Sequence, residues 1–157
     1  MNKMIKSPNR IMARPSEIYI FMGGSIEMGT AVDWQTELFE KTKARNITYL
    51  NPRRDDWDFS WVQRIDNPQF NEQVNWELNG LLESDYQVFV FDPKTISPIT
   101  LMELGFCIKN DRVLGVVCPE EYFRKGNVDI ICSRYDVPVF ETVDDLASYI
   151  NKVLAHR

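Results

Sequence analysis

The chain has 157 residues, of which 44% are hydrophobic, and it carries a formal net charge of −5. This length suits one domain that buries roughly two thirds of its unfolded surface. Without a dominant basic patch the chain is not expected to bind a nucleic-acid polymer, whereas charge does not exclude small nucleic-acid-derived molecules. No apolar run approaches the ~20 residues that span a bilayer, so we expect no membrane partner.

The cysteines argue against a metal site. Cys107, Cys118 and Cys132 are widely spaced, form no CxxC pair and have only His156 to help them. Structural zinc needs closely spaced thiolates and imidazoles, so we expect no zinc site. Free thiols are typical of a reducing compartment, and we therefore expect a cytoplasmic protein.

The first expected element is a flexible N-terminal tail, residues 1–16, whose basic residues lack the apolar segment of a secretory signal peptide. Residues 17–22 are apolar and rich in β-forming side chains, as in a buried strand. This strand runs into Gly23, Gly24 and Ser25, where glycines allow the backbone to approach a ligand closely. The pattern is neither GxGxxG nor a P-loop, and a tight strand-to-helix turn is the alternative explanation.

Helical and strand patterns then alternate along the chain. Apolar residues recur at helical spacing in the helices, and short β-rich runs mark the strands. Asn67 and Thr142 are suited to cap the helices that follow them. The predicted helices cover residues 31–43, 67–82, 98–110, 127–132 and 142–155, and the later strands residues 47–50, 86–91, 113–117 and 137–140. The alternation predicts one α/β domain over residues 17–157, with five parallel strands and right-handed crossovers.

Residues 51–68 form an unusual connection. Two tryptophans, a phenylalanine, four aspartates and three arginines share this segment without clear periodicity. A loop this long is usually functional or disordered, and its aromatic content argues against disorder. Trp57 offers a flat surface for a base, and Asp58 offers acceptors for the edge of that base. The alternative is a structural loop packed by its own aromatic side chains.

Two glutamates are candidate catalytic residues. Glu103 lies one turn into the helix after strand 86–91, and ligands bind at the carboxyl ends of strands in open α/β sheets. Glu77 falls on an otherwise apolar helix face, where a carboxylate either is paired or functional or reaches solvent at the boundary. Both acids and the glycine turn are expected in one crevice at the topological switch point. Two carboxylates suit glycosyl chemistry, in which one attacks an anomeric carbon and the other positions or protonates groups.

Three short motifs carry a resemblance to a known family. They are Met-Glu-Leu-Gly at residues 102–105, Gly-Gly-Ser-Ile at 23–26 and Glu-Leu-Asn-Gly-Leu at 77–81. With these motifs the chain resembles the nucleoside 2-deoxyribosyltransferase family, including the related nucleoside 5′-monophosphate N-glycosidases, over about residues 18–150. The resemblance implies a flavodoxin-like (Rossmann-like) doubly wound fold, a small nucleoside or nucleotide substrate, no cofactor, and a homodimer or higher homo-oligomer.

The same resemblance implies roles for individual residues. Glu103 matches the family nucleophile, which attacks C1′ of the sugar and forms a glycosyl ester. Glu77 falls where the family commonly has an aspartate that contacts the sugar or the base. Asn127 falls where a neighbouring subunit donates an asparagine to the sugar in some members, so the complete site is expected to need two chains.

Ser97 marks the main departure from the transferases. It stands six residues before Glu103, where the transferases carry an aspartate that handles the base proton. The monophosphate glycosidases carry a serine at that spacing and use it for phosphate, and Ser25 fits the same role.

Glu27 argues against a phosphate-bearing substrate. The glycosidases have an arginine at this position, and a carboxylate there would repel a phosphate. Arg53, Arg54 or Arg124 is then needed to supply the missing charge. Asp92, at the end of the third strand, is the substitute candidate for the general acid, unless it only starts an Asp-Pro turn.

Three functions stay open at this level. The first is a transferase that moves the 2-deoxyribosyl group from one base to another through a covalent ester on Glu103. The second is a hydrolase of nucleoside monophosphates, and the third a non-catalytic nucleotide-binding module. The pattern of residues 51–58 resembles a subgroup known only as deoxyribosyltransferase-like, which does not separate the three.

Overall fold

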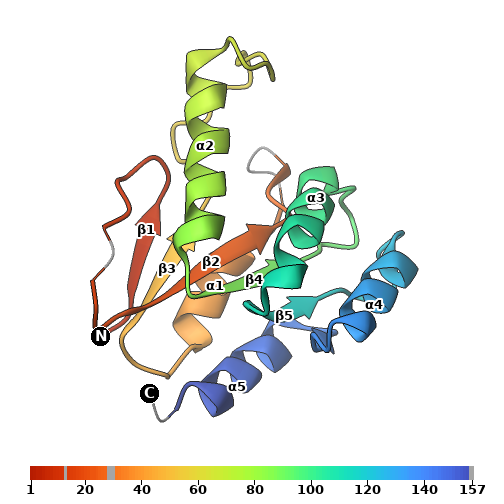
Figure 1. The fold of residues 1–157 in the computed structure, drawn as a ribbon. Coiled ribbons are helices and arrows are strands. Elements are labelled where there is room, and N and C mark those ends of the chain that lie inside the picture. The colour runs from red at the N-terminus through yellow and green to blue at the C-terminus, as the bar shows by residue number, and fades with distance from the viewer. Residues whose placement is uncertain (13, 28–30, 156–157) are drawn as a thin grey trace.

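The computed structural model describes residues 1–12, 14–27 and 31–155, so His156 lies outside the described residues. Across these residues, six strands form one sheet in the order β1-β3-β2-β4-β5-β6, and every neighbouring pair is parallel (Figure 1). The strands are β1 (Lys3–Lys6), β2 (Ile18–Gly24), β3 (Ile47–Asn51), β4 (Tyr86–Val90), β5 (Val113–Val117) and β6 (Val139–Phe140).

The sheet has one strand more than the sequence predicted. β1 lies inside the expected flexible tail and pairs with β3, with Lys3 opposite Thr48 and Lys6 opposite Asn51. The prediction of five strands was therefore wrong, because a four-residue strand with a lysine at each end lacks the apolar run that marks a buried strand. The predicted single α/β domain with a parallel sheet is confirmed, and it is consistent with a flavodoxin-like fold.

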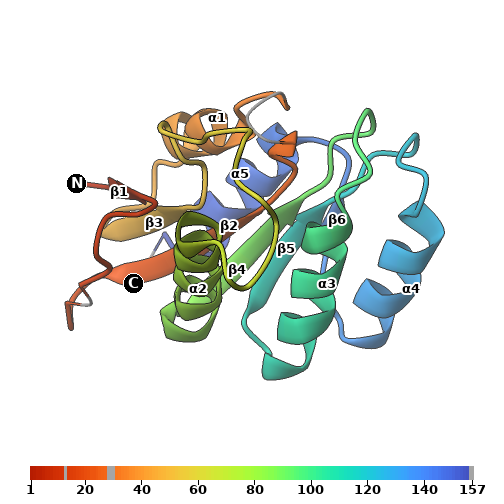
Figure 2. The same cartoon turned by 90° about the horizontal axis from the view of Figure 1, so that it is seen from above.

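Helices cover both faces of the sheet. They are α1 (Trp34–Lys41), α2 (Pro68–Glu83), α3 (Pro98–Cys107), α4 (Lys125–Arg134) and α5 (Val143–Val153), with a short 3-10 turn at Ile108–Asn110. Figure 2 shows α1 and α5 on one face and α2, α3 and α4 on the other. Each layer has its own apolar core, which includes Leu38 and Ile150 on the first face and Leu81 and Leu104 on the second. None of the helices in the described part of the chain is long and apolar enough to cross a membrane.

The helix starts follow from capping side chains. Asn67 accepts a hydrogen bond from the Phe70 N–H at 3.0 Å, and Thr142 accepts one from the Asp145 N–H at 3.2 Å, so both predicted N-caps are confirmed. Asp33 caps α1 in the same way, and this helix therefore begins at Trp34, three residues later than predicted.

The chain changes direction across the sheet between β2 and β4. These strands are neighbours in the sheet, although β3 lies between them in the sequence, so a topological switch point lies at their carboxyl ends. A Cβ atom on Gly23 would lie 2.5 Å from Phe89 Cε1, and one on Gly24 would lie 2.5 Å from the Val90 carbonyl oxygen. Close packing of β2 on β4 and its neighbours therefore requires both glycines. The N-terminal half of α2 and the loop before it project beyond this end of the sheet (Figure 1).

Candidate active site

A cavity of about 520 Å³ lies at the carboxyl end of β2, between α2, α3 and the loop that follows β3. Apolar side chains such as Phe70, Val74 and Met102 form much of its wall. The polar and charged lining residues are Ser25, Glu27, Arg54, Gln63, Gln73, Glu77, Ser97, Thr100 and Glu103. The predicted convergence of the glycine turn, Glu77 and Glu103 is thus present in the structure.

Glu77 and Glu103 form a carboxyl pair in the lining of this cavity. Glu103 is 7% exposed, Glu77 is partly buried, and the two side chains are hydrogen-bonded to each other. Burial raises the pKa of Glu77 to about 7, and burial together with the Glu77 charge raises the pKa of Glu103 well above its usual value. Two carboxyls in such contact hold one proton between them near neutral pH, because both cannot ionise cheaply.

Three hydroxyl groups form a second polar cluster, next to the N-terminus of α3. The Ser97 Oγ lies 2.5 Å from the Ser25 Oγ and 2.7 Å from the Thr95 Oγ1, and the last two atoms are 2.9 Å apart. The Asp92 backbone N–H donates to the Ser25 Oγ at 2.9 Å. Ser97 has a left-handed backbone with φ of 48°, which turns its hydroxyl toward the cluster and leaves α3 without a side-chain cap. Sequence reasoning missed Thr95, since nothing in the spacing marks it.

Glu27 places a carboxylate at the same helix end. The backbone N–H of Ser97 donates to the Glu27 Oε1 at 3.2 Å. Because helix N-termini attract anions, this side chain occupies a position that an anionic ligand would otherwise favour.

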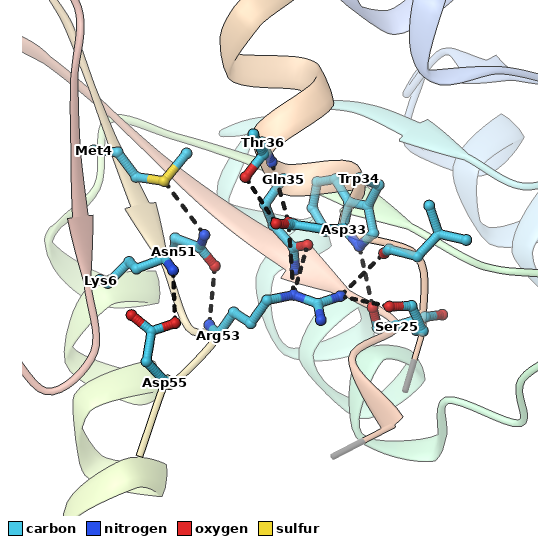
Figure 3. A network of polar contacts seen from close by, with 12 residues as sticks. Met4, Lys6, Ser25, Asp33, Trp34, Gln35, Thr36, Asn51, Arg53 and Asp55 are labelled. Carbon is cyan, nitrogen blue, oxygen red and sulfur yellow. Dashed lines mark hydrogen bonds and ion pairs between the residues drawn. The ribbon is translucent and has the colours of Figure 1, made fainter. Parts of the chain in front are cut away.

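The three candidate arginines have different surroundings. Figure 3 shows Arg53 reaching from the end of β3 toward α1, where it donates to the Gln35 Oε1 at 3.3 Å and pairs with Asp33 at 3.6 Å. Arg53 therefore connects the loop after β3 with the segment at the start of α1. Arg124 is exposed, and its guanidinium lies 5.2 Å from the centre of the Phe123 ring.

Arg54 is the candidate arginine that lines the cavity. Its side chain is 6% exposed, and it pairs with Asp56 at 2.7 Å and Glu72 at 2.8 Å. Its guanidinium also lies 4.9 Å from the centre of the Trp61 ring. Two carboxylates thus already neutralise this cation, and it is held mainly as part of the loop.

Trp57 and Asp58 differ in position. Trp57 lines the cavity, and its ring packs edge-on against Trp61 with centroids 5.1 Å apart. Within the described residues, the buried indole N–H of Trp57 has no hydrogen-bond partner. Asp58 is exposed, does not line the cavity, and accepts the Ser60 N–H at 2.8 Å, as in a local turn.

Asp92 and Asn127 also lie outside the lining of the cavity. The Asp92 carboxylate accepts the Lys94 N–H at 2.8 Å, which is the turn-starting arrangement that the sequence left as an alternative. Asn127 is exposed near the start of α4, and its contribution to a neighbouring subunit stays a prediction. Within the described residues, no group of three or more His, Cys, Asp or Glu side chains is placed to hold a metal ion.

Fold and cavity together define a doubly wound α/β domain with a carboxyl pair in a cavity at its switch point. The family described as "nucleoside 2-deoxyribosyltransferase like" matches residues 17–122, and the chain belongs to this family. A conserved protein from Enterococcus faecalis V583 has a similar crystal structure, with a TM-score of 0.62 over 88% of this chain and 99% of that chain. At 13% identity, that likeness shows the fold. No curated protein matches the chain.

Proposed function

We propose that this protein cleaves or exchanges the N-glycosidic bond of a 2′-deoxynucleoside. Membership of the family supports glycosyl chemistry, and the hydrogen-bonded Glu77–Glu103 pair is the observation that carries the proposal. A buried pair with one proton supplies a nucleophile and an acid within one contact.

In the proposed reaction Glu103 is the nucleophile. The shared proton rests on Glu103, because the ionised form of Glu77 is stabilised by its hydrogen bonds, and it passes across the contact to Glu77 as Glu103 attacks. The ionised Glu103 oxygen forms a bond to C1′ as the bond from C1′ to the base nitrogen breaks, and the electron pair of that bond leaves with the base. The base takes up the proton from Glu77, which becomes a carboxylate. An acceptor base then forms a new bond to C1′ through a ring nitrogen, releases Glu103 as a carboxylate and returns a proton to Glu77. Water in place of the acceptor base gives hydrolysis. Asp92, the other candidate acid, is bound to a local backbone N–H outside the cavity, which favours Glu77 in this role.

The apolar wall supports transfer over hydrolysis. Phe70, Val74, Leu78, Ile99 and Met102 line the same cavity as the carboxyl pair, and an apolar lining holds water less well than an acceptor base. A second base is then better placed than water to accept the sugar, provided that it covers the opening of the cavity.

The environment of Ser97 supports a nucleoside over a 5′-monophosphate. The hydroxyl cluster by itself suits either a sugar hydroxyl or a phosphate. Glu27, however, places a negative charge on the same helix end, and Arg54 is already paired with two acids. At about 4 Å, like charges repel by about 1 kcal/mol in water and about 4 kcal/mol near a protein surface, so a neutral 5′-hydroxyl is preferred.

Incubation with 2′-deoxyinosine and free adenine, followed by chromatography, tests the proposal. A new deoxynucleoside supports transfer, whereas free deoxyribose supports hydrolysis of the nucleoside. Release of sugar phosphate from deoxynucleoside monophosphates would favour the monophosphate hydrolase instead. No turnover across deoxynucleosides and their monophosphates, with ligand binding retained, would favour the binding module.

The Glu103→Gln variant should lose at least about 1,000-fold in turnover while its far-UV circular dichroism is unchanged, because an amide cannot form the ester. Glu83→Gln, an exposed acid at the end of α2, is the matched control and should retain activity. Full activity in Glu103→Gln would overturn the assignment of the nucleophile.

A further inference from the structure

The carboxyl pair is connected to the N-terminal edge of the sheet by a chain of hydrogen bonds. The Ser7 Oγ donates to the Gln73 Oε1 at 2.5 Å, and the Gln73 Nε2 donates to the Glu77 Oε1 at 2.8 Å. Ser7 follows β1 directly and is 3% exposed, and Gln73 on α2 is 4% exposed. Glu77 continues the chain to Glu103.

The orientation of the Gln73 amide is fixed by its third partner. The Nε2 atom also donates to the Pro52 carbonyl oxygen at 2.8 Å, and a backbone carbonyl can only accept. The nitrogen must therefore face Pro52 and Glu77, and the oxygen must face Ser7. A hydroxyl can donate to that oxygen, so all three contacts agree on one orientation.

The Ser7 end of this chain is itself held in place. The Ser7 N–H donates to the Asn51 carbonyl oxygen at 3.0 Å, which continues the pairing of β1 with β3. The Trp76 indole N–H donates to the Asn9 carbonyl oxygen at 2.8 Å and joins the same segment to α2. A residue far from the cavity in sequence thus orients an amide inside it.

A fixed donor on one oxygen of Glu77 has a chemical consequence. The Glu77 Oε1 that accepts from Gln73 is the oxygen least able to carry a proton, because a proton there would face another donor. The bond also stabilises the ionised form of Glu77. The shared proton is therefore directed to the contact between Glu77 and Glu103.

We propose that Gln73 is a positioning residue for the carboxyl pair, oriented by Ser7 and Pro52, that directs the shared proton between Glu77 and Glu103. The inference rests on the proposed function for its catalytic meaning, although the hydrogen-bond chain can be tested without any substrate. Gln73 touches neither sugar nor base in this role, since it acts through Glu77.

Other charged or titratable groups face the pair from three elements. Glu27 and Arg54 line the cavity from the loops after β2 and β3, and Cys107 lies one turn beyond Glu103 on α3. Arg54 is paired with acids of its own, and burial, reinforced by the Glu103 charge, raises the pKa of Cys107 to about 11. Arg54 and Cys107 therefore do not titrate together with the pair. The effect of Glu27 is removed by repeating the titration in a protein that carries Glu27→Gln.

Titration of the full chain labelled with [¹³Cδ]glutamate tests the role of Gln73. Carbon NMR from about pH 4 to pH 10 follows the two carboxyls, whose signals are assigned from their disappearance in Glu77→Gln and Glu103→Gln. Gln73→Met keeps the length of the side chain and removes both donors, so the Glu77 midpoint should rise by about one pH unit. Ser7→Ala should raise the Glu77 midpoint by a smaller amount, because the Gln73 amide is still present but has lost the hydrogen bond from Ser7 that orients it.

Asn75→Ala is the matched control, since Asn75 is an exposed amide on α2 that donates to Asn71 one turn earlier in the same helix. Midpoints in Gln73→Met and Ser7→Ala equal to that of Asn75→Ala would overturn the proposal. If Gln73→Met loses its far-UV circular dichroism, Ser7→Ala decides by the same criterion.

Turnover of 2′-deoxyinosine is measured on the same samples as a function of pH. A shifted titration without turnover in any sample would contradict the proposed function alone. Turnover with an unshifted titration would contradict the role of Gln73 alone. A purely structural role would lower activity equally at every pH, whereas loss of the donor moves the acidic limb of the pH profile upward.

Discussion

Replacing Glu77 with glutamine tests the carboxyl pair through protein stability, without any substrate. The new amide has almost the shape of the carboxyl group, can accept from Gln73 and can donate to Glu103. It removes one buried titratable group and leaves the packing of α2 unchanged. The expected result is a protein that is inactive yet more stable than the native chain at alkaline pH.

The magnitude follows from the two pKa values of Glu77. Its pKa in the folded protein is about 7, against an ordinary value of 4.5. Below pH 4.5 this carboxyl is protonated in both the folded and the unfolded chain and does not affect the free energy of unfolding. As the pH rises from 4.5 toward 7, the unfolded chain loses this proton more readily than the folded protein, and the free energy of unfolding falls. The difference between the two values corresponds to about 3 kcal/mol. Glu77→Gln should thus be more stable than the native chain by about 3 kcal/mol at pH 8, and by almost nothing near pH 4.5.

Urea unfolding followed by circular dichroism measures this difference at several pH values for both proteins. Glu83→Gln provides the control, because an exposed acid should change the free energy of unfolding little at any pH. A Glu77→Gln protein that is less stable than the native chain at pH 8 would refute the reasoning. So would a stability difference that does not depend on pH, since only titration of the pair produces the slope.

Two further substitutions test how the cavity recognises its ligand. Glu27→Gln should raise kcat/KM for a deoxynucleoside 5′-monophosphate relative to the nucleoside by about tenfold, because one repulsive charge is removed from the helix end. Chromatographic assays of both substrates measure this ratio of kcat/KM values, and an unchanged ratio would contradict the role of the Glu27 charge. Trp57→Leu should weaken binding of free adenine by about tenfold, since stacking of a base on an aromatic ring contributes about 1–3 kcal/mol. Calorimetry measures the affinity, Phe59→Leu in the exposed part of the same loop is the control, and equal affinities would contradict a stacking role.

The placement of Glu77 and Glu103 in one crevice could be predicted because the signals are local, although their direct contact could not. Glu103 follows a buried strand within a helix start, and Glu77 interrupts an apolar stripe, so each stands out in its own segment. The parallel topology then brings helix starts and strand ends together at one edge. The same reasoning predicted the caps at Asn67 and Thr142, which depend on residues three positions away.

Residues whose roles depend on distant partners could not be predicted in this way. Gln73 is one amide among several polar residues on α2, and its partners come from residues 7 and 52. Its spacing of four from Glu77 was the only available signal. Conversely, Asp58 and Asp92 drew attention as acids, but backbone N–H groups two residues away already bind both carboxylates.

The two edges of the sheet bear on how the protein behaves when it is concentrated. Unpaired edge strands can add a strand from another molecule, and short or lysine-bearing edges oppose this. β1 has four residues with Lys3 and Lys6 at its ends, which pair with Glu17 and Asp55, and β6 at the opposite edge has two residues. Neither edge offers a long flat template for backbone pairing. Aggregation through strand addition is thus disfavoured at both sides of the sheet, and copies that associate are expected to meet through the side chains of helices and loops.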